Sequence, residues 1–236
     1  MSFSRRLLPP ALLEGPALDA AMVGIGMLFT ADAAPSANIE DTVLSASIAG
    51  MQDSDFRVLS VLATWLGVHH ERLNADRLVK IVGAHDEPRT KAFWASVAQW
   101  LRSDRRLARL GRWSGGRTDL LPIGSDFQIR RRGEDPRFLD SPLRVPAGVL
   151  RDRQQDVLSP QELAKKHVVY RQRIIMGPTY RADMWALLEV EPALTPAELA
   201  RQSYGSFATA WQVKRDFELV RGSESSAGKV RVRRAS

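Results

Sequence analysis

The sequence predicts a mainly α-helical fold with small β-hairpins (α+β), built from an N-terminal helical domain and a smaller C-terminal domain. Apolar residues recur at spacings of three and four in several segments, which is the pattern of helices with one buried face. Short apolar runs separated by glycine occur at 105–145 and 219–232, and they predict strands and turns. The chain has 236 residues, of which 44% are hydrophobic and 26% charged. This is the composition of a globular protein, so disorder of the whole chain is excluded.

The N-terminal domain is predicted over residues 1–145. The clearest helix covers 55–68, where Phe56, Leu59, Leu62 and Leu66 lie on one face. Asn74 is a favourable N-cap for the helix that follows it. The expected helices are 17–29, 39–51, 55–68, 75–82 and 90–101.

Residues 105–145 are predicted to form turn-punctuated strands. The apolar runs 107–110, 120–123 and 127–129 are separated by glycines, and Arg130, Arg131 and Arg132 follow the last of them. Residues 146–179 are expected to be an extended connector and a linking helix. The capping-box sequence from Ser159 to Glu162 predicts that this helix runs from 159 to 175.

The C-terminal domain, residues 180–236, is predicted to contain a helix-turn-helix. A helix at 180–190 precedes Thr195-Pro196-Ala197-Glu198, a strong start signal for a short helix at 196–202. Gly205 can adopt positive φ in the following turn, and Ser206 can cap a second helix at 207–217. Helix, short helix, three-residue turn and helix is the order of a helix-turn-helix.

Two short β-type runs, 219–221 and 229–232, are predicted to form a basic hairpin after this motif. With ELARQSYGSFATAWQVKRDFELV at 198–220, residues 180–235 resemble the winged helix-turn-helix of bacterial transcriptional regulators. The resemblance implies that the second helix enters the major groove and that the hairpin, or wing, contacts the backbone or the minor groove. It places Ser206, Thr209, Gln212 and Arg215 at or beside the groove, and Arg231, Arg233 and Arg234 on the wing.

A weaker pattern of the same kind covers residues 55–132. Three helices followed by short strands and Arg130–Arg132 would make a second winged unit, although the connection at 83–89 is long for a helix-turn-helix. In that arrangement the three arginines would add to the DNA-binding surface.

The distribution of charge favours a polyanionic partner. The chain carries a net charge of +7, with 17 basic and 9 acidic residues between 101 and 179. Most of these basic residues are arginine, which binds phosphate in a bidentate manner. The alternative is a solvated, arginine-rich surface. Binding of structured RNA fits the arginine content but not the helix-turn-helix.

We therefore expect a DNA-binding transcriptional regulator that contacts double-stranded DNA and acts as a dimer. The acidic N-terminal half is the expected surface for the second copy or for a protein partner. An antitoxin that represses its own operon would have the same architecture. The competing hypothesis is an adaptor subunit of a larger complex, in which Phe207 and Trp211 dock a protein, because exposed aromatic residues are typical of protein interfaces.

Enzymatic activity, a cofactor and a metal site are not expected. The chain has no cysteine, and its four histidines lack further ligands at suitable spacing. No phosphate-binding loop, G-x-S-x-G or H-E-x-x-H motif occurs. The most apolar segment, 20–29, is about half the length that a bilayer requires, so we expect a cytoplasmic protein without a membrane span.

Overall fold

The computed structural model of the protein describes the backbone of residues 12–233 and the side chains of residues 12–221. Within this range the chain is mainly helical and contains one two-stranded parallel sheet. The chain divides into two compact units, residues 1–167 and residues 168–236, and each is described by itself.

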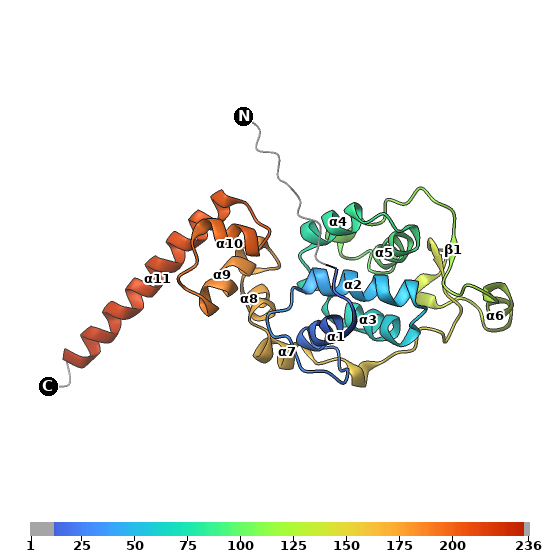
Figure 1. The fold of residues 1–236 in the computed structure, drawn as a ribbon, viewed down its shortest axis with the longest axis horizontal. Coiled ribbons are helices and arrows are strands. Elements are labelled where there is room, and N and C mark those ends of the chain that lie inside the picture. The colour runs from blue at the N-terminus through green and yellow to red at the C-terminus, as the bar shows by residue number, and fades with distance from the viewer. Residues whose placement is uncertain (1–11, 234–236) are drawn as a thin grey trace, which may run out of the picture. The chain divides into compact units, whose positions relative to one another are not determined.

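The first unit is built around helix α2, against which α1, α3, α4 and α5 pack (Figure 1). Almost every residue of α2 is buried, including Glu40 and Asp41. Asp41 forms an ion pair with Arg77 of α4, and Glu40 Oε1 accepts a hydrogen bond from the Asn74 backbone N–H at 2.8 Å. These contacts satisfy carboxylates that would otherwise be costly to bury. The five helices are α1 Gly15–Gly24, α2 Ile39–Gln52, α3 Phe56–His69, α4 Ala75–Ala84 and α5 Pro88–Trp100.

The helices of this unit agree closely with those predicted, except at the end of the first. Helix α1 ends at Gly24 rather than near residue 29, and Met27 forms an isolated antiparallel bridge with Val157. A Cβ atom added to Gly24 would lie 2.0 Å from the carbonyl oxygen of Ala34. The close approach of the following loop therefore requires glycine at this position.

The strands expected between 105 and 145 are mostly absent from the described structure. Strand β1 (Thr118–Asp119) pairs in parallel with β2 (Leu143–Arg144), whereas no strand forms at 107–110, 120–123 or 127–129, so these predictions are wrong. Residues 127–129 belong to helix α6 (Ser125–Arg132), which begins after Gly124 at φ +83° and ends before Gly133 at φ +79°. The region contains no hairpin between 101 and 132, so it does not form the second winged unit.

Shorter elements complete the first unit. Ser96 of α5 accepts a hydrogen bond from the backbone N–H of Leu143 at 2.8 Å, which attaches β2 to the helical core. The segment after β2 runs along α3 and ends in α7. These remaining elements are η1 His70–Arg72, η2 Arg105–Leu107, η3 Pro136–Phe138, η4 Gln154–Asp156 and α7 Pro160–Lys166.

The second unit contains helices α8 (Val168–Met176), α9 (Tyr180–Val190), α10 (Pro196–Gln202) and α11 (Phe207–Arg233). The predicted helix at 159–175 is thus two helices, interrupted at His167, which has an extended backbone conformation. Helix α8 lies in the segment predicted as a connector, yet it packs on α9. The apolar core of the unit consists of Met184, Leu188, Leu194, Leu199, Ala210, Val213 and Phe217.

A buried ion pair joins α8 to α9. The guanidinium of Arg173 is fully buried, and its Nε donates to Asp183 Oδ1 at 2.7 Å while Nη2 donates to Oδ2 at 3.0 Å. This bidentate geometry fixes both the spacing and the rotation of the two helices.

The wing predicted after the helix-turn-helix is not present in the described structure. Residues 219–232 continue helix α11, and Leu219 and Val220 are exposed on it rather than paired in a strand. No proline occurs between 207 and 233 to end the helix. The glycines there each cost about 1 kcal/mol in a helix, which weakens the helix without preventing it.

Candidate nucleic-acid interface

A tight turn connects α10 to α11. Helix α10, which leads into this turn, has a well-capped start. Thr195 accepts the Glu198 backbone N–H at 3.3 Å, and Glu198 Oε2 accepts the Thr195 N–H at 2.9 Å. The hydrogen bond from the Thr195 hydroxyl is the main cause that lowers the pKa of Glu198. This reciprocal capping explains why the start of α10 was predictable from the sequence.

The conformation of the turn differs from our prediction in one respect. Tyr204, not Gly205, has the positive φ, at 58°. A Cβ atom on Gly205 would lie 2.2 Å from Met184 Cε. The absence of a Cβ thus lets the turn pack closely against the Met184 methyl group of α9, and the glycine itself has no left-handed backbone.

Two of the expected DNA-contacting residues cap the start of α11. Ser206 Oγ accepts the backbone N–H of Thr209 at 3.1 Å and lies 2.7 Å from Thr209 Oγ1. Both side chains are half-buried. Their established role in the structure is therefore to fix the first turn of α11.

The exposed face of α11 carries the other residues predicted from the sequence. Phe207 is 60% exposed and Trp211 51% exposed, and Gln212 and Arg215 are also exposed. The guanidinium carbon of Arg215 lies 5.4 Å from the centroid of the Trp211 ring, within the range of a cation–π interaction. The face thus combines two aromatic rings, one amide and one cation.

Neighbouring side chains of this part of α11 form ion pairs and hydrogen bonds, and one of them, Asp216, places Oδ1 3.4 Å from Arg215 Nη2. Asp216 accepts a hydrogen bond from Arg181 of α9 at 2.8 Å, and this bond is the main cause that lowers the pKa of Asp216. Lys214 Nζ donates to the carbonyl of Pro192 at 2.6 Å and lies 3.3 Å from Glu218 Oε1. These contacts fix the rotation of α11, so that Gln212 and Arg215 face solvent.

The remaining predicted DNA-binding residues lie elsewhere. Arg130, Arg131 and Arg132 form the exposed last turn of α6 in the first unit, not the end of a strand. Cations in the last turn of a helix are favoured by its dipole. Arg231 and Arg233 lie in the part of α11 whose side chains are outside the described structure, and Arg234 lies outside the described residues.

Much of the arginine excess between 101 and 179 takes part in internal ion pairs. Arg117 pairs with Glu134 at 2.6 Å and Arg137 with Asp135 at 2.7 Å, and several others are similarly placed. The further pairs are Arg106–Asp104, Arg109–Asp76, Arg144–Asp119, Arg153–Asp156, Arg171–Glu189 and Arg173–Asp183. Net charge therefore overstates the basic surface that is free for a polyanion.

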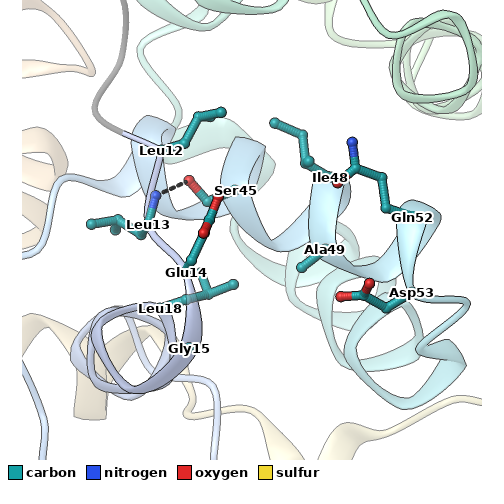
Figure 2. Close-up of a pocket in the computed structure, with 10 residues that line it drawn as sticks. All are labelled: Leu12, Leu13, Glu14, Gly15, Leu18, Ser45, Ile48, Ala49, Gln52 and Asp53. Carbon is teal, nitrogen blue, oxygen red and sulfur yellow. Dashed lines mark hydrogen bonds between the residues drawn. The ribbon is translucent and has the colours of Figure 1, made fainter.

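Among the cavities of the described part of the first unit, one lies against α2 and another against α3. The first, of about 280 Å³, lies between the segment from Leu12 to Leu18 and helix α2, where Ser45 accepts the Leu13 backbone N–H at 3.0 Å (Figure 2). Its charged side chains are Glu14 and Asp53, with no nucleophile–base pair. The other cavity, lined by Arg57, Arg151 and Arg153, was not identified from the sequence. The only sequence signal was the pair of arginines at 151 and 153.

Among the described residues, no group of three or more His, Asp or Glu side chains is arranged to hold a metal ion. No helix in the same part of the chain is long and apolar enough to cross a membrane. No family model matches the chain, and no significant match was found among curated proteins or solved structures.

Proposed function

We propose that the protein binds double-stranded DNA through α11 and acts as a transcriptional regulator. The observation that carries the proposal is the pair Gln212 and Arg215, which lie exposed about one turn apart on the helix that follows the tight turn. Helices α9 and α10 support α11 from behind through the apolar core. This is the arrangement in which a helix-turn-helix presents its second helix to the major groove.

The chemistry of the exposed face fits base recognition. A glutamine can make two hydrogen bonds to adenine, and an arginine can do the same to guanine. Phe207 and Ala208, also exposed, can contact the methyl group of thymine. Thr209 and Ser206, engaged with each other, would position the helix rather than read bases.

The experiment is fluorescence anisotropy with the full chain and DNA from upstream of its own gene, beside a scrambled duplex and across a salt series. We expect the native sequence to be preferred at physiological salt. Gln212→Ala with Arg215→Ala should reduce this preference by about 1–3 kcal/mol per residue, because base contacts carry the discrimination.

The matched control is Gln155→Ala with Arg102→Ala, which makes the same chemical changes at exposed positions of the first unit. This control should leave the preference for the native duplex unchanged. Equal binding of both duplexes at every salt concentration, or equal effects of the two double variants, would contradict sequence-specific recognition by α11.

A second candidate function is that of an adaptor that docks a protein partner. It is favoured by the exposure of Phe207 and Trp211, two large apolar rings one turn apart. Docking on these rings should depend weakly on salt, whereas DNA binding should weaken steeply as salt rises. Loss of a co-purifying partner on Trp211→Ala, with DNA binding unchanged, would favour the adaptor.

A further inference from the structure

The first unit contains a cavity whose charged lining is entirely basic. It has a volume of about 340 Å³ and lies between the start of α3, Leu121 and residues 148–153. Cavities that hold small molecules are usually of this size or larger. The lining residues are Phe56, Arg57, Ser60, Leu121, Gly148, Val149, Arg151 and Arg153.

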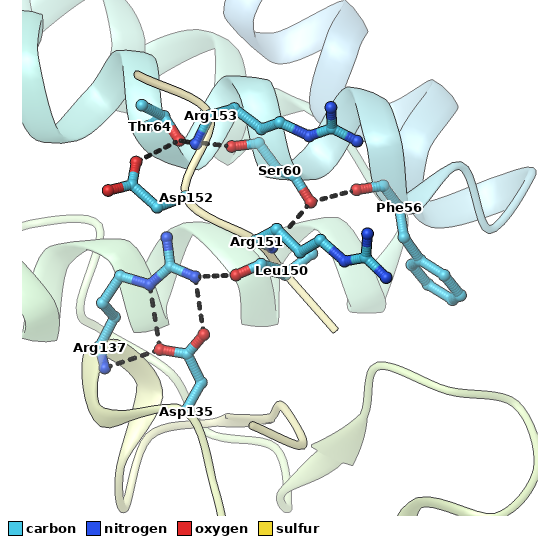
Figure 3. Close-up of polar contacts among 9 residues, drawn as sticks. All are labelled: Phe56, Ser60, Thr64, Asp135, Arg137, Leu150, Arg151, Asp152 and Arg153. Carbon is cyan, nitrogen blue, oxygen red and sulfur yellow. Dashed lines mark hydrogen bonds and ion pairs between the residues drawn. The ribbon is translucent and has the colours of Figure 1, made fainter. Parts of the chain in front are cut away.

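The segment that supplies two of these arginines is held in place at successive positions. Ser60 Oγ accepts the backbone N–H of Arg151 at 3.1 Å, and Thr64 Oγ1 accepts that of Arg153 at 3.0 Å. Arg137, itself paired with Asp135, donates to the carbonyl of Leu150. Figure 3 shows these contacts, with the side chains of Arg151 and Arg153 extending toward the same side as Phe56. The backbone that carries the two arginines is therefore fixed before any ligand binds, which reduces the entropy lost on binding.

The charges at this cavity are incompletely neutralised. Arg153 Nη1 lies 3.2 Å from Asp156 Oδ2, but its buried Nε has no hydrogen-bond partner within the described structure. No carboxylate forms an ion pair with Arg57 or Arg151 among residues 12–221, and the guanidinium of Arg57 stacks 5.4 Å from the Phe29 ring centroid. Nearby Asp55 and Asp152 accept hydrogen bonds from α3 instead.

Apart from Ser60, whose hydroxyl is engaged with the backbone, the rest of the lining is apolar or glycine. Phe56 and Val149 are half-buried, and Leu121 closes another side of the cavity. An occupant that uses the whole lining would combine an anionic group, bound by the guanidiniums, with a compact apolar or aromatic group. Guanidinium groups match the geometry of phosphate oxygens, which accept two parallel hydrogen bonds.

We propose that this cavity binds a small phosphate ester, with its phosphate on Arg57, Arg151 and Arg153 and its organic part against Phe56, Leu121 and Val149. The site lies entirely in the first unit and does not depend on DNA binding by α11.

Calorimetric titration of the full chain with phenyl phosphate tests the proposal. We expect saturable binding that weakens about tenfold in Arg57→Ala and in Arg151→Ala, since each removes a charge-assisted contact. Arg151→Lys should weaken binding less than Arg151→Ala, because lysine keeps the positive charge although it lacks the bidentate hydrogen-bonding geometry of the guanidinium group. Arg102→Ala and Arg112→Ala, which remove exposed arginines of the same unit, should have no effect.

Four further measurements serve as controls. Phenol should not bind, and inorganic phosphate should bind more weakly than phenyl phosphate, because it leaves the apolar lining in water. Gln212→Ala with Arg215→Ala should leave phenyl phosphate binding intact, which separates this site from the proposed DNA site. Thermal unfolding of each variant shows whether it is folded. Absence of binding to the folded protein up to about 10 mM, equal binding of inorganic phosphate, or equal loss in the control variants would overturn the proposal.

Discussion

His69 couples the stability of the first unit to pH. Its ring is fully buried beside Trp65, and its Nε2 lies 3.0 Å from the carbonyl of Leu158, to which it donates as the neutral tautomer. Burial lowers the pKa of His69 to about 4, against an opposing effect of the bond to Leu158. The folded protein therefore holds this histidine neutral at pH values where the unfolded chain binds a proton.

The consequence is a loss of stability in acid. The contribution of neutral His69 is complete above the unfolded pKa of 6.5 and is lost as the pH falls toward 4. We expect up to about 3 kcal/mol of destabilisation across this range from His69. Urea unfolding at several pH values measures it, and His69→Gln should show a smaller decrease than the wild type. The same pH dependence in both proteins would contradict this role.

Gly24 is the position where a single methyl group should be least tolerated. A Cβ atom there would meet the backbone carbonyl of Ala34, which cannot move as a flexible side chain can. We expect Gly24→Ala to lower the free energy of unfolding by about 1–3 kcal/mol or more.

The matched control is Gly83→Ala. Gly83 lies in α4, is exposed and has no heavy atom within 4 Å of an added Cβ. This substitution should stabilise the protein by about 0.5–1 kcal/mol, because alanine favours helix. Chemical denaturation of both variants gives the comparison, and a neutral Gly24→Ala would show that the loop at Ala34 is free to shift.

At the scale of the elements, α8 and α9 depend on the pair Arg173–Asp183. Removing one member leaves the other charge buried, so we expect Asp183→Ala to destabilise the second unit by about 3–5 kcal/mol. Replacing both, as in Arg173→Met with Asp183→Leu, should restore much of this loss, because no buried charge remains. Thermal unfolding followed by circular dichroism measures the stability of the single and double variants. A double variant as unstable as Asp183→Ala would contradict the explanation.

The sequence was most informative where capping and proline residues set the ends of an element. Helix α10 has the predicted bounds because Thr195 and Pro196 supply its cap and first-turn geometry. Helix α9 also has the predicted bounds, and its N-cap, Thr179, was not identified from the sequence. The buried face of α3 was likewise predictable from its spacing of apolar residues.

The elements that were predicted wrongly are those with short apolar runs and no such signals. Phe127 and Ile129 alternate as in a strand, yet they lie in α6, whose ends are set by the positive φ of Gly124 and Gly133. Leu219 and Val220, followed by glycine and serine, predict a strand, but α11 continues through these residues. Short runs of this kind fit strand and helix equally well. The cavity of Arg57, Arg151 and Arg153 depends on tertiary contacts that no local pattern encodes.

At the scale of the whole molecule, the distribution of charge decides which surface can bind a polyanion. Most of the arginines between 101 and 179 are paired with carboxylates, whereas Arg130, Arg131 and Arg132 are exposed and form no ion pair within residues 12–221. They lie in the first unit, and Gln212 and Arg215 lie in the second. Contact of DNA with α6 would therefore add phosphate contacts from the first unit to the base contacts proposed for α11.

The contributions of α6 and α11 to DNA binding can be separated through the salt dependence of binding. If all three arginines of α6 contact phosphates, replacing them with glutamine should reduce the slope of log K against log salt by about 2.7, because each neutralised phosphate contributes about 0.9. The preference for the native duplex over the scrambled one should not change, since phosphate contacts carry no sequence information. Gln212→Ala with Arg215→Ala should instead lower the preference for the native duplex over the scrambled one. An unchanged slope in the α6 variant, measured by anisotropy over the same salt series, would restrict the DNA interface to the second unit and leave Arg130–Arg132 as solvated residues that stabilise the end of their helix.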